Sequence, residues 1–323
     1  MSDGAAHPQL LARSPALERL RNAPGAFYLL ALMAVALTAW TPGFFTPANL
    51  TNVLLQVAVL TIVALGMTLV ILTEGIDLSL GPVLGLCGVA ASLLVVGGHP
   101  LPVAIAAALG IGVAFGLLNG SLIAVAGMPP FIVTLGAFGI AQSIAMVLTR
   151  GDSVVRLPDY YRWFNDGVFL GIPVPLWATA AVFALTWALL YRTKFGRYVF
   201  AIGGNRQALQ LAGTRVRAYH VAVYVYAGAL TAIASFIMTA RMNAAHPTIG
   251  VGIEFDAIAA VILGGTRFEK GYGGIAGTVV GALAVGVLRN GLNLLGVNAE
   301  WQVAIVGIVI ITAVGIDSLR GAP

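Results

Sequence analysis

The stretch RTKFGRYVFAIGGNRQALQLAGTRVR, Arg192 to Arg217, holds six lysine or arginine residues and no acid. It lies between two runs of residues that are apolar enough to sit in lipid, at 174–192 and 218–240. Such a concentration of cations is unusual in a chain of which only 9% of the residues are charged. Because basic loops between membrane spans face the cytoplasm, this stretch predicts both a membrane fold and its orientation.

The composition of the 323 residues is that of a membrane protein. Hydrophobic residues make up 59% of the chain and charged residues 9%, whereas about 25% of a soluble protein is charged. The net charge of +5 does not indicate nucleic-acid binding, because the cations lie between apolar runs rather than on one folded face. One cysteine, Cys87, and four scattered histidines predict no disulfide, no metal site and no cofactor. We expect an all-α polytopic protein whose surroundings are a lipid bilayer.

Ten apolar runs are candidates for membrane spans, since a helix needs about 20 apolar residues to cross the bilayer core. They lie at approximately 26–41, 50–73, 78–97, 101–126, 129–149, 174–192, 218–240, 255–265, 274–296 and 301–319. The eighth, FDAIAAVILGG, is too short to span alone and predicts a half-helix that continues into glycine-rich backbone. The sequence therefore predicts about ten transmembrane helices in a single domain at 26–319.

The positive-inside rule orients these spans. With the N-terminus inside, alternation places 12 of the 17 basic residues in the cytoplasm: Arg13, Arg19, Arg21, Arg192, Lys194, Arg197, Arg206, Arg215, Arg217, Arg267, Lys270 and Arg320. The main outside loop, 150–173, balances three arginines with three aspartates. We expect cytoplasmic tails at 1–25 and 320–323, a cytoplasmic loop at 193–217 and a periplasmic loop at 150–173.

Within the basic loop, GGNRQALQLAG (203–213) predicts a short amphipathic helix parallel to the membrane. Asn205 is a typical N-cap, and Gly213 is typical of the position just past a helix C-terminus. Apolar residues at i, i+3, i+4 spacing form its apolar face: Ala208, Leu211 and Ala212, with Leu209 beside them. A two-turn helix is marginal alone in water. The pattern leaves open a helix on the lipid surface and a docking helix that fits a groove on a cytoplasmic partner.

Two glycine ridges predict close helix–helix packing. One is formed by Gly112, Gly116 and Gly120 in the fourth run, and the other by Gly273, Gly277 and Gly281 at the start of the ninth.

Polar residues in or beside the runs are candidates for a translocation path, since such groups usually face a cavity or the interface. Asp77 or Ser79, in LTEGIDLSLG, either caps the next helix or contributes to a path. Arg289 snorkels to the interface, pairs with an acid or lines a path. Glu254 and Asp256 favour the N-terminus of the eighth run. The candidate path residues are Asp77, Ser79, Asn119, Phe131, Thr134, Arg289, Asn290 and Asn293, and interhelical hydrogen bonding is the alternative for the amides and for Thr134.

No catalytic motif is present. The sequence contains no GxSxG elbow, HExxH pair or GxxxxGK[ST] phosphate loop. We therefore expect that the chain is not an enzyme, and that any active transport takes its energy from an ion gradient or from another subunit.

Five stretches together resemble the permease subunit of bacterial monosaccharide ABC importers, of the ribose, xylose, arabinose and galactose type. They are GMTLVILTEGIDLSLG (66–81), GLLNGSLIAVAGMPPFIVTLG (116–136), TKFGRYVFAIGGNRQALQLAGTRV (193–216), GVGIEFDAIAAVILGGTRFEKGYGGIAGTVVGA (250–282) and NGLNLLGV (290–297). The last looks closest to ribose-type members.

The resemblance implies a type II importer permease with ten helices in the bacterial inner membrane. Two permease copies, identical or related, would form one pathway with two ATP-binding cassette domains, often fused in one chain, on the cytoplasmic face. A periplasmic sugar-binding protein would deliver the substrate. The resemblance also implies a coupling helix that inserts into the ATPase, formed by Gly203, Gly204, Asn205, Arg206, Ala208, Leu209, Leu211 and Gly213.

Three functions of different classes remain to be compared. The first is the permease of an ATP-driven importer for a pentose or similar monosaccharide. The second is a standalone ion-coupled carrier or channel for a small polar solute, and the third is a membrane enzyme. The sequence contains no set of catalytic residues that would support a membrane enzyme. The first two differ at 193–217, because a standalone carrier has no use for a docking helix, and this favours the importer.

Overall fold

A computed structural model describes residues 25–41, 43–268 and 271–319. Each of the ten apolar runs forms a helix. Their bounds are α2 Gly25–Trp40, α3 Pro47–Leu72, α4 Leu80–Val96, α5 Leu101–Ala124, α6 Pro130–Thr149, α8 Val174–Arg192, α10 Val216–Met242, α11 Ile253–Leu263, α12 Ile275–Leu294 and α13 Ala299–Leu319. Apart from Gly25, the predicted tails at 1–25 and 320–323 lie outside the described residues.

Six of these helices are long and apolar enough to cross a bilayer: α3, α5, α6, α8, α10 and α12. They make the chain a multi-pass membrane protein, while the full count of ten spans stays a prediction. The half-helix expected at 255–265 is confirmed. It is α11, whose 11 residues cover about 16 Å at 1.5 Å per residue, and it ends at Gly264 and Gly265.

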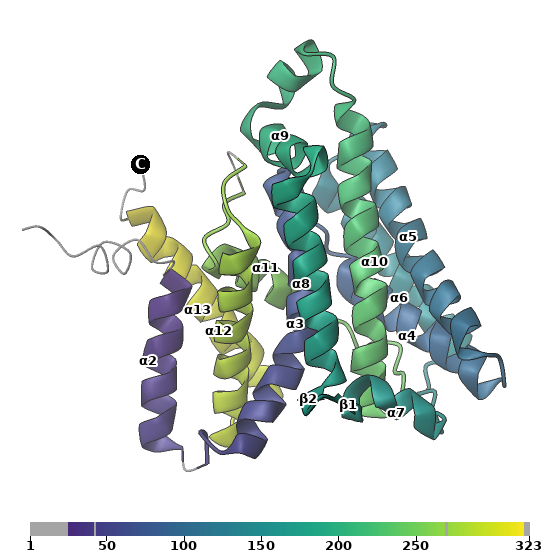
Figure 1. Cartoon of the computed structure of the whole chain (residues 1–323), viewed down its shortest axis with the longest axis vertical. Helices are drawn as coiled ribbons and strands as arrows, with labels where there is room; N and C mark the ends of the chain where they lie inside the picture. Colours follow the sequence, from purple (N-terminus) through teal and green to yellow (C-terminus); the bar gives the residue numbers. More distant parts are fainter. Residues whose placement is uncertain (1–24, 42, 269–270, 320–323) are drawn as a thin grey trace, which may run out of the picture.

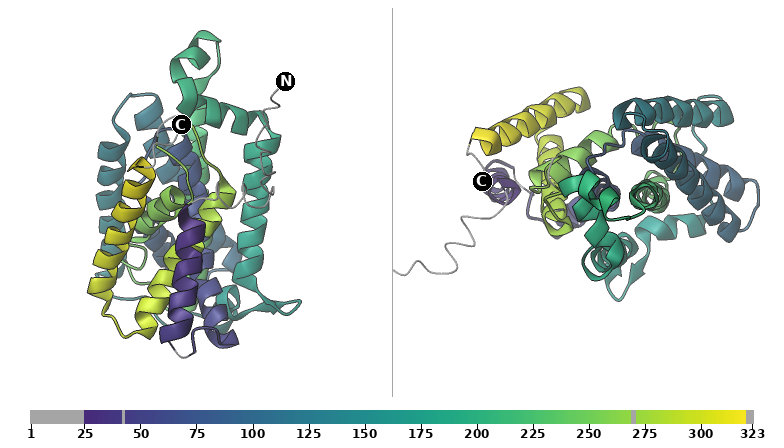
Figure 2. Two further views of the ribbon diagram at one scale, coloured as in Figure 1. Left: turned by 90° about the vertical axis from the view of Figure 1, so that its left-hand side faces the viewer. Right: turned by 90° about the horizontal axis from the view of Figure 1, so that it is seen from above.

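The helices form one bundle with two distinct ends (Figures 1 and 2). The start of α2, the end of α13, helix α9 (Lys194–Leu211) and the segment between α11 and α12 lie at one end, which we call the basic end. Helix α7 (Asp159–Asp166) and the strands β1 (Val168–Phe169) and β2 (Ile172–Pro173) lie at the opposite end. The two ends of the described chain therefore share one side with the basic loop, as an even number of crossings requires.

Helix α3 forms the centre of the bundle. Every residue from Val57 to Leu72 is buried, because α3 packs against α8, α10, α11 and α12. A helix that is apolar on all sides is stable only in such a position or in lipid. The neighbouring α4 is nearly as buried, whereas α5, α6 and α8 each leave an apolar face exposed.

The first glycine ridge packs as predicted, and so do two members of the second, whereas Gly273 precedes α12 and lies against the side chain of Thr266. A methyl group on Gly116 would lie 2.5 Å from the carbonyl oxygen of Tyr224 in α10, and methyl groups on Gly112 and Gly120 would meet the same helix. Gly277 meets the backbone of Gly264, and Gly281 meets that of Ala260 in α11. The ridges thus bring α5 onto α10 and α12 onto α11 at distances that side chains would prevent.

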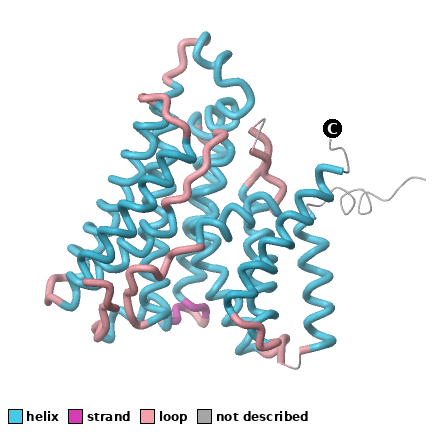
Figure 3. Tube along the Cα trace, turned by 180° about the vertical axis from the view of Figure 1, so that it is seen from behind, coloured by secondary structure: helices cyan, strands magenta, loops and turns pink. Residues whose placement is uncertain are grey.

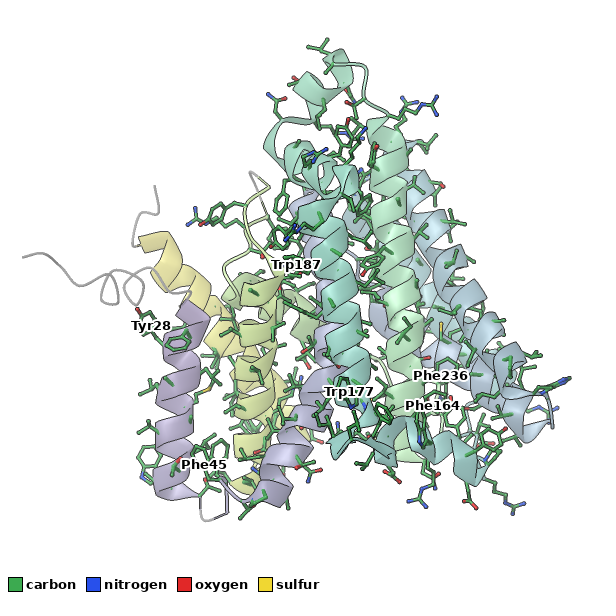
Figure 4. All side chains as sticks on the ribbon, in the orientation of Figure 1. Tyr28, Phe45, Phe164, Trp177, Trp187 and Phe236 are labelled. Atoms are coloured by element: carbon green, nitrogen blue, oxygen red, sulfur yellow. The ribbon has the colours of Figure 1, made fainter. Side chains whose placement is uncertain are left out.

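The loop at 150–173 contains a helix and two strands, whereas the sequence predicted an all-α fold with a loop there. Strands β1 and β2 pair antiparallel across Leu170 and Gly171, which both have positive φ (52° and 78°), as a tight hairpin turn needs. In α7, Tyr161 is buried, and burial raises the pKa of its hydroxyl. Figure 4 shows Phe164 beside Phe236 of α10, with 5.3 Å between the ring centroids. Aromatic packing therefore holds α7 on the bundle.

Loop backbone also lies between the two ends of the bundle, as Figure 3 shows. The segment 243–252 returns from the end of α10 toward α4, where Pro247 and Gly250 contact Gly85 and Gly81. Irregular backbone at this depth is tolerated in membranes only where protein or water satisfies it.

Candidate coupling segment and polar sites within the bundle

Helix α9 consists of two halves joined at Asn205, whose φ of −159° and ψ of 89° break the helix. The first half, from Lys194 to Gly204, was not predicted. Its signal was nevertheless present in the sequence, since Thr193 is an N-cap type and Val199 and Ile202 are apolar three residues apart. Both apolar side chains are buried under the first half, which packs on α3, α8 and α10.

The second half is a two-turn helix that we call the plug, Arg206 to Leu211. At its start, Asn205 Oδ1 accepts a hydrogen bond from the amide of Ala208 at 2.9 Å. At its end, the amide of Gly213 donates to Gln210 O at 3.0 Å and that of Thr214 to Leu209 O at 3.1 Å. With Gly213 at φ 74°, these two bonds form a Schellman motif. The N-cap and C-terminal stop predicted from the sequence are thus confirmed.

Among the described residues, the plug projects farthest at the basic end (Figure 1). Its apolar face is bare: Leu211 is 90% exposed, and Ala208 and Ala212 are exposed beside it. Arg206 and Leu209 are half-buried, and Gly204 is exposed. An apolar side chain that projects beyond the bundle on a capped helix has the geometry of a docking element. Gly203, in contrast, is buried against the bundle.

Asp77, Ser79 and Asn119 come together in one buried cluster, which we call the Asp77 cluster. Asp77 Oδ1 accepts hydrogen bonds from the amide of Ser79 at 2.9 Å and from its hydroxyl at 2.6 Å. The amide of Asn119 donates to the Ser79 hydroxyl at 2.9 Å. Of the two residues considered as caps, Ser79 occupies the N-cap position of α4 but makes no side-chain cap bond, because its hydroxyl donates to Asp77. Asn119 Oδ1 is buried without a hydrogen-bond partner.

Glu254 and Asp256 both lie in the first turn of α11, where they were predicted, and they have different partners. The Glu254 carboxylate accepts from the amide of Gly252 at 3.0 and 3.1 Å. Asp256 pairs with Arg289 of α12, with 2.6 Å between Oδ1 and Nη2. Of the three roles considered for Arg289, the structure shows the ion pair.

Among the described residues, the remaining candidate path residues form no hydrogen bond to the Asp77 cluster. Asn290 exchanges two hydrogen bonds with Asn49 of α3, at 3.0 and 2.9 Å, and Asn293 accepts from Gln302 of α13 at 2.8 Å. These are the interhelical bonds of the alternative interpretation. Thr134 is buried with an unpartnered hydroxyl, and Phe131 is 55% exposed on the surface of α6.

Sequence reasoning missed Asn49, Gln302 and Tyr224 as partners. The Tyr224 hydroxyl donates to the carbonyl of Ile76 at 3.5 Å, next to the Asp77 cluster. Asn49 and Asn290 are 241 positions apart, and no spacing rule within one sequence links such a pair.

The sequence profile of the family described as branched-chain amino acid transport system / permease component matches residues 49–314. The ribose import permease RbsC of Escherichia coli K12 is 45% identical over 297 residues, which cover 90% of this chain and 92% of that protein. RbsC of Bacillus subtilis 168 is 42% identical over 300 residues, 92% of this chain and 93% of that protein. The D-allose permease AlsC of E. coli K12 is 36% identical over 298 residues, 91% of each.

A solved structure shares the fold. An inward-facing structure of a transporter of the metal-chelate ABC type matches 92% of this chain and 98% of that chain, with a TM-score of 0.52 and 13% sequence identity. At this identity the match shows a common architecture and nothing about the substrate.

Proposed function

The chain belongs to the family of branched-chain amino acid transport system / permease components, and from this membership we propose that it carries ribose or a closely related sugar into the bacterial cell. It is a permease subunit of an ABC importer for monosaccharides and a multi-pass protein of the inner membrane. Relatives that cover nine-tenths of the chain are named as permeases for ribose and for D-allose. Ribose is the first choice because the ribose permeases are the more similar of these relatives, at 45% and 42% identity against 36%.

The observation that carries the coupling role is the plug. Its caps are complete, yet Leu211 is 90% exposed at the basic end. A helix this short gains stability from packing, and a groove on an ATP-binding cassette subunit would cover its apolar face. Because the chain has no phosphate-binding loop of its own, this partner, which we expect to carry two fused ATPase domains, would supply the hydrolysis. The residues that we assign to the contact are Arg206, Ala208, Leu209 and Leu211 of the plug, with the flanking Gly204, Asn205 and Gly213.

The rest of the assembly follows from the orientation. The basic end faces the cytoplasm together with both termini, and ten helices cross the membrane. A second permease copy, identical or related, completes the pathway, and α7 and the hairpin at 150–173 face a periplasmic sugar-binding protein. ATP-driven closure of the ATPase domains would rock the bundle and alternate its access.

Within the bundle, the Asp77 cluster is our choice for the sugar path. It combines a carboxylate, a hydroxyl and an amide, and Asn119 Oδ1 has no partner in the closed cluster. Sugars are recognised by a few placed polar groups of this kind. Arg289, Asn290 and Asn293 already bond to protein partners, which supports a role in holding helices together.

The test is retention of the ATPase by the purified permease, followed by uptake of radiolabelled ribose into proteoliposomes that contain the binding protein. Arg206→Glu, Leu209→Asp and Leu211→Asp should each lose the ATPase while insertion and folding stay normal. Leu170→Asp is the matched control, because Leu170 is 77% exposed at the opposite end. Retention of the ATPase by all three plug variants would refute the docking role. Full uptake by the permease alone would support the ion-coupled carrier.

A further inference from the structure

Helix α9 meets the bundle at a place where three backbones touch. A methyl group on Gly203 would overlap the carbonyl oxygen of Leu72 and lie 2.9 Å from Cα of Gly271. A methyl group on Gly271 would overlap the carbonyl oxygen of Phe200 and lie 3.0 Å from the amide nitrogen of Gly204. No side chain separates α9, the end of α3 and the segment between α11 and α12 at this point. We call Gly203, Gly271 and the Leu72 carbonyl the glycine junction.

The end of α3 and the turn after it connect the glycine junction to the Asp77 cluster. Leu72 is the last residue of α3, and the turn that follows folds back on this helix, with the amides of Glu74 and Gly75 donating to Ile71 O and Val70 O at 3.0 Å. Asp77 lies five residues beyond Leu72 and is held by Ser79 and Asn119. A displacement of the end of α3 would therefore displace the Asp77 carboxylate.

The segment that contains Gly271 connects the glycine junction to α12. Gly271 lies four residues before Ile275, where α12 begins. One turn of α3 away from Leu72, the hydroxyls of Thr68 and Thr278 form a buried hydrogen bond of 2.7 Å between α3 and α12. Gly277 and Gly281 press α12 directly onto α11. Helices α3, α11 and α12 are thus joined just beneath the point that α9 touches.

From these contacts we infer that the glycine junction transmits the movement of the plug to α3 and α12, and so to the Asp77 cluster. Gly203 lies three residues before Arg206, the first residue of the plug, so a force on the plug reaches the glycine junction through a single turn of backbone. Contact between backbones leaves no rotatable side chain to absorb the displacement. Gly203 and Gly271 are positioning residues, because they lie away from the exposed face of the plug and outside the Asp77 cluster. The inference rests on the proposed function.

The experiment compares sugar transported per ATP hydrolysed in proteoliposomes that hold the complete importer. Gly203→Ala and Gly271→Ala should each retain the ATPase subunit and hydrolyse ATP within twofold of the unsubstituted complex. The number of sugar molecules carried per ATP should fall at least tenfold, because a methyl group separates α9 from α3 and the α11–α12 segment. Gly110→Ala is the matched control, since Gly110 has no atom within 4 Å of an added methyl group, and its ratio should not change.

Thr68→Val is a second test of the inference that adds no atoms to the contact between the helices. It keeps the shape of the side chain, removes the hydrogen bond to Thr278 and should lower the ratio two- to fivefold. If the alanine variants fail to fold, an unchanged ratio in Thr68→Val overturns the inference. A merely structural role for the glycines would lower uptake and hydrolysis in parallel with the amount of folded protein and leave the ratio constant, which also overturns it. An unsubstituted complex with no ATP-driven uptake would instead refute the proposed function.

Discussion

Breaking the ion pair between Asp256 and Arg289 should weaken the bundle more than any exposed charge change. The two side chains are 14% and 25% exposed and their charged atoms are 2.6 Å apart. At an effective dielectric constant of about 20, charges at this separation attract by about 6 kcal/mol before the cost of desolvation. Removing one partner of a buried pair costs about 3–5 kcal/mol, since the other charge is left buried and unpaired. Because a quarter of Arg289 remains exposed, we expect about 3 kcal/mol, the lower end of that range.

The assay is equilibrium unfolding in mixed detergent micelles, applied to Asp256→Asn, Arg289→Gln and the double variant. Each single variant should lose about 3 kcal/mol of the free energy of unfolding. The double variant should lose no more than a single one, because the second substitution removes the charge that the first left unpaired. The coupling energy would then be about 3 kcal/mol. Arg162→Gln is the control, since its ion pair with Asp166 is half-exposed, and pairs of this kind contribute about 0–1 kcal/mol. Single losses that add in the double variant would refute a direct interaction.

Three further predictions concern packing, topology and the path. Gly116→Ala should lower the free energy of unfolding by about 1–3 kcal/mol, because the methyl group overpacks against α10, whereas Gly110→Ala should leave it unchanged; equal effects would contradict the predicted ridge contact. In intact cells, a membrane-impermeant maleimide should label Tyr160→Cys and should label Gln207→Cys only after permeabilisation. The native cysteine is buried and should not react. The reverse labelling pattern would show that the chain has the opposite orientation. Asp77→Asn should reduce ribose uptake at least tenfold while ATPase retention stays normal, and normal uptake would remove this residue from the path.

Much of this fold could be predicted from local sequence. All ten apolar runs are helices within a few residues of the expected bounds, and the short α11 was recognised from its length and its glycines. The caps of the plug were predicted for the same reason: Asn205 and Gly213 each act on backbone groups within three or four residues of themselves.

The expectations that were wrong or missing involve contacts that the residue pattern of a single segment does not describe. The Ser79 side chain was considered as a cap for α4, but its hydroxyl donates to the carboxylate of Asp77. The first half of α9 is stabilised by burial on three other helices, and α7 by the aromatic ring of Phe236. Each of these contacts depends on where a carboxylate or another helix lies in space, which the spacing of apolar residues in one segment does not show.

The sequence by itself determined that the chain crosses the membrane many times and where the capped plug leaves the bundle. Lipid offers no hydrogen bonds to the backbone, so the backbone groups of each span must bond to one another in a helix. A run of about 20 apolar residues is therefore enough to predict such a helix. Only the tertiary structure decided that Asp256 meets Arg289, that Asn49 meets Asn290 and that Gly203 rests on Leu72 and Gly271. Such contacts depend on how whole helices cross, which the packing of many side chains decides together.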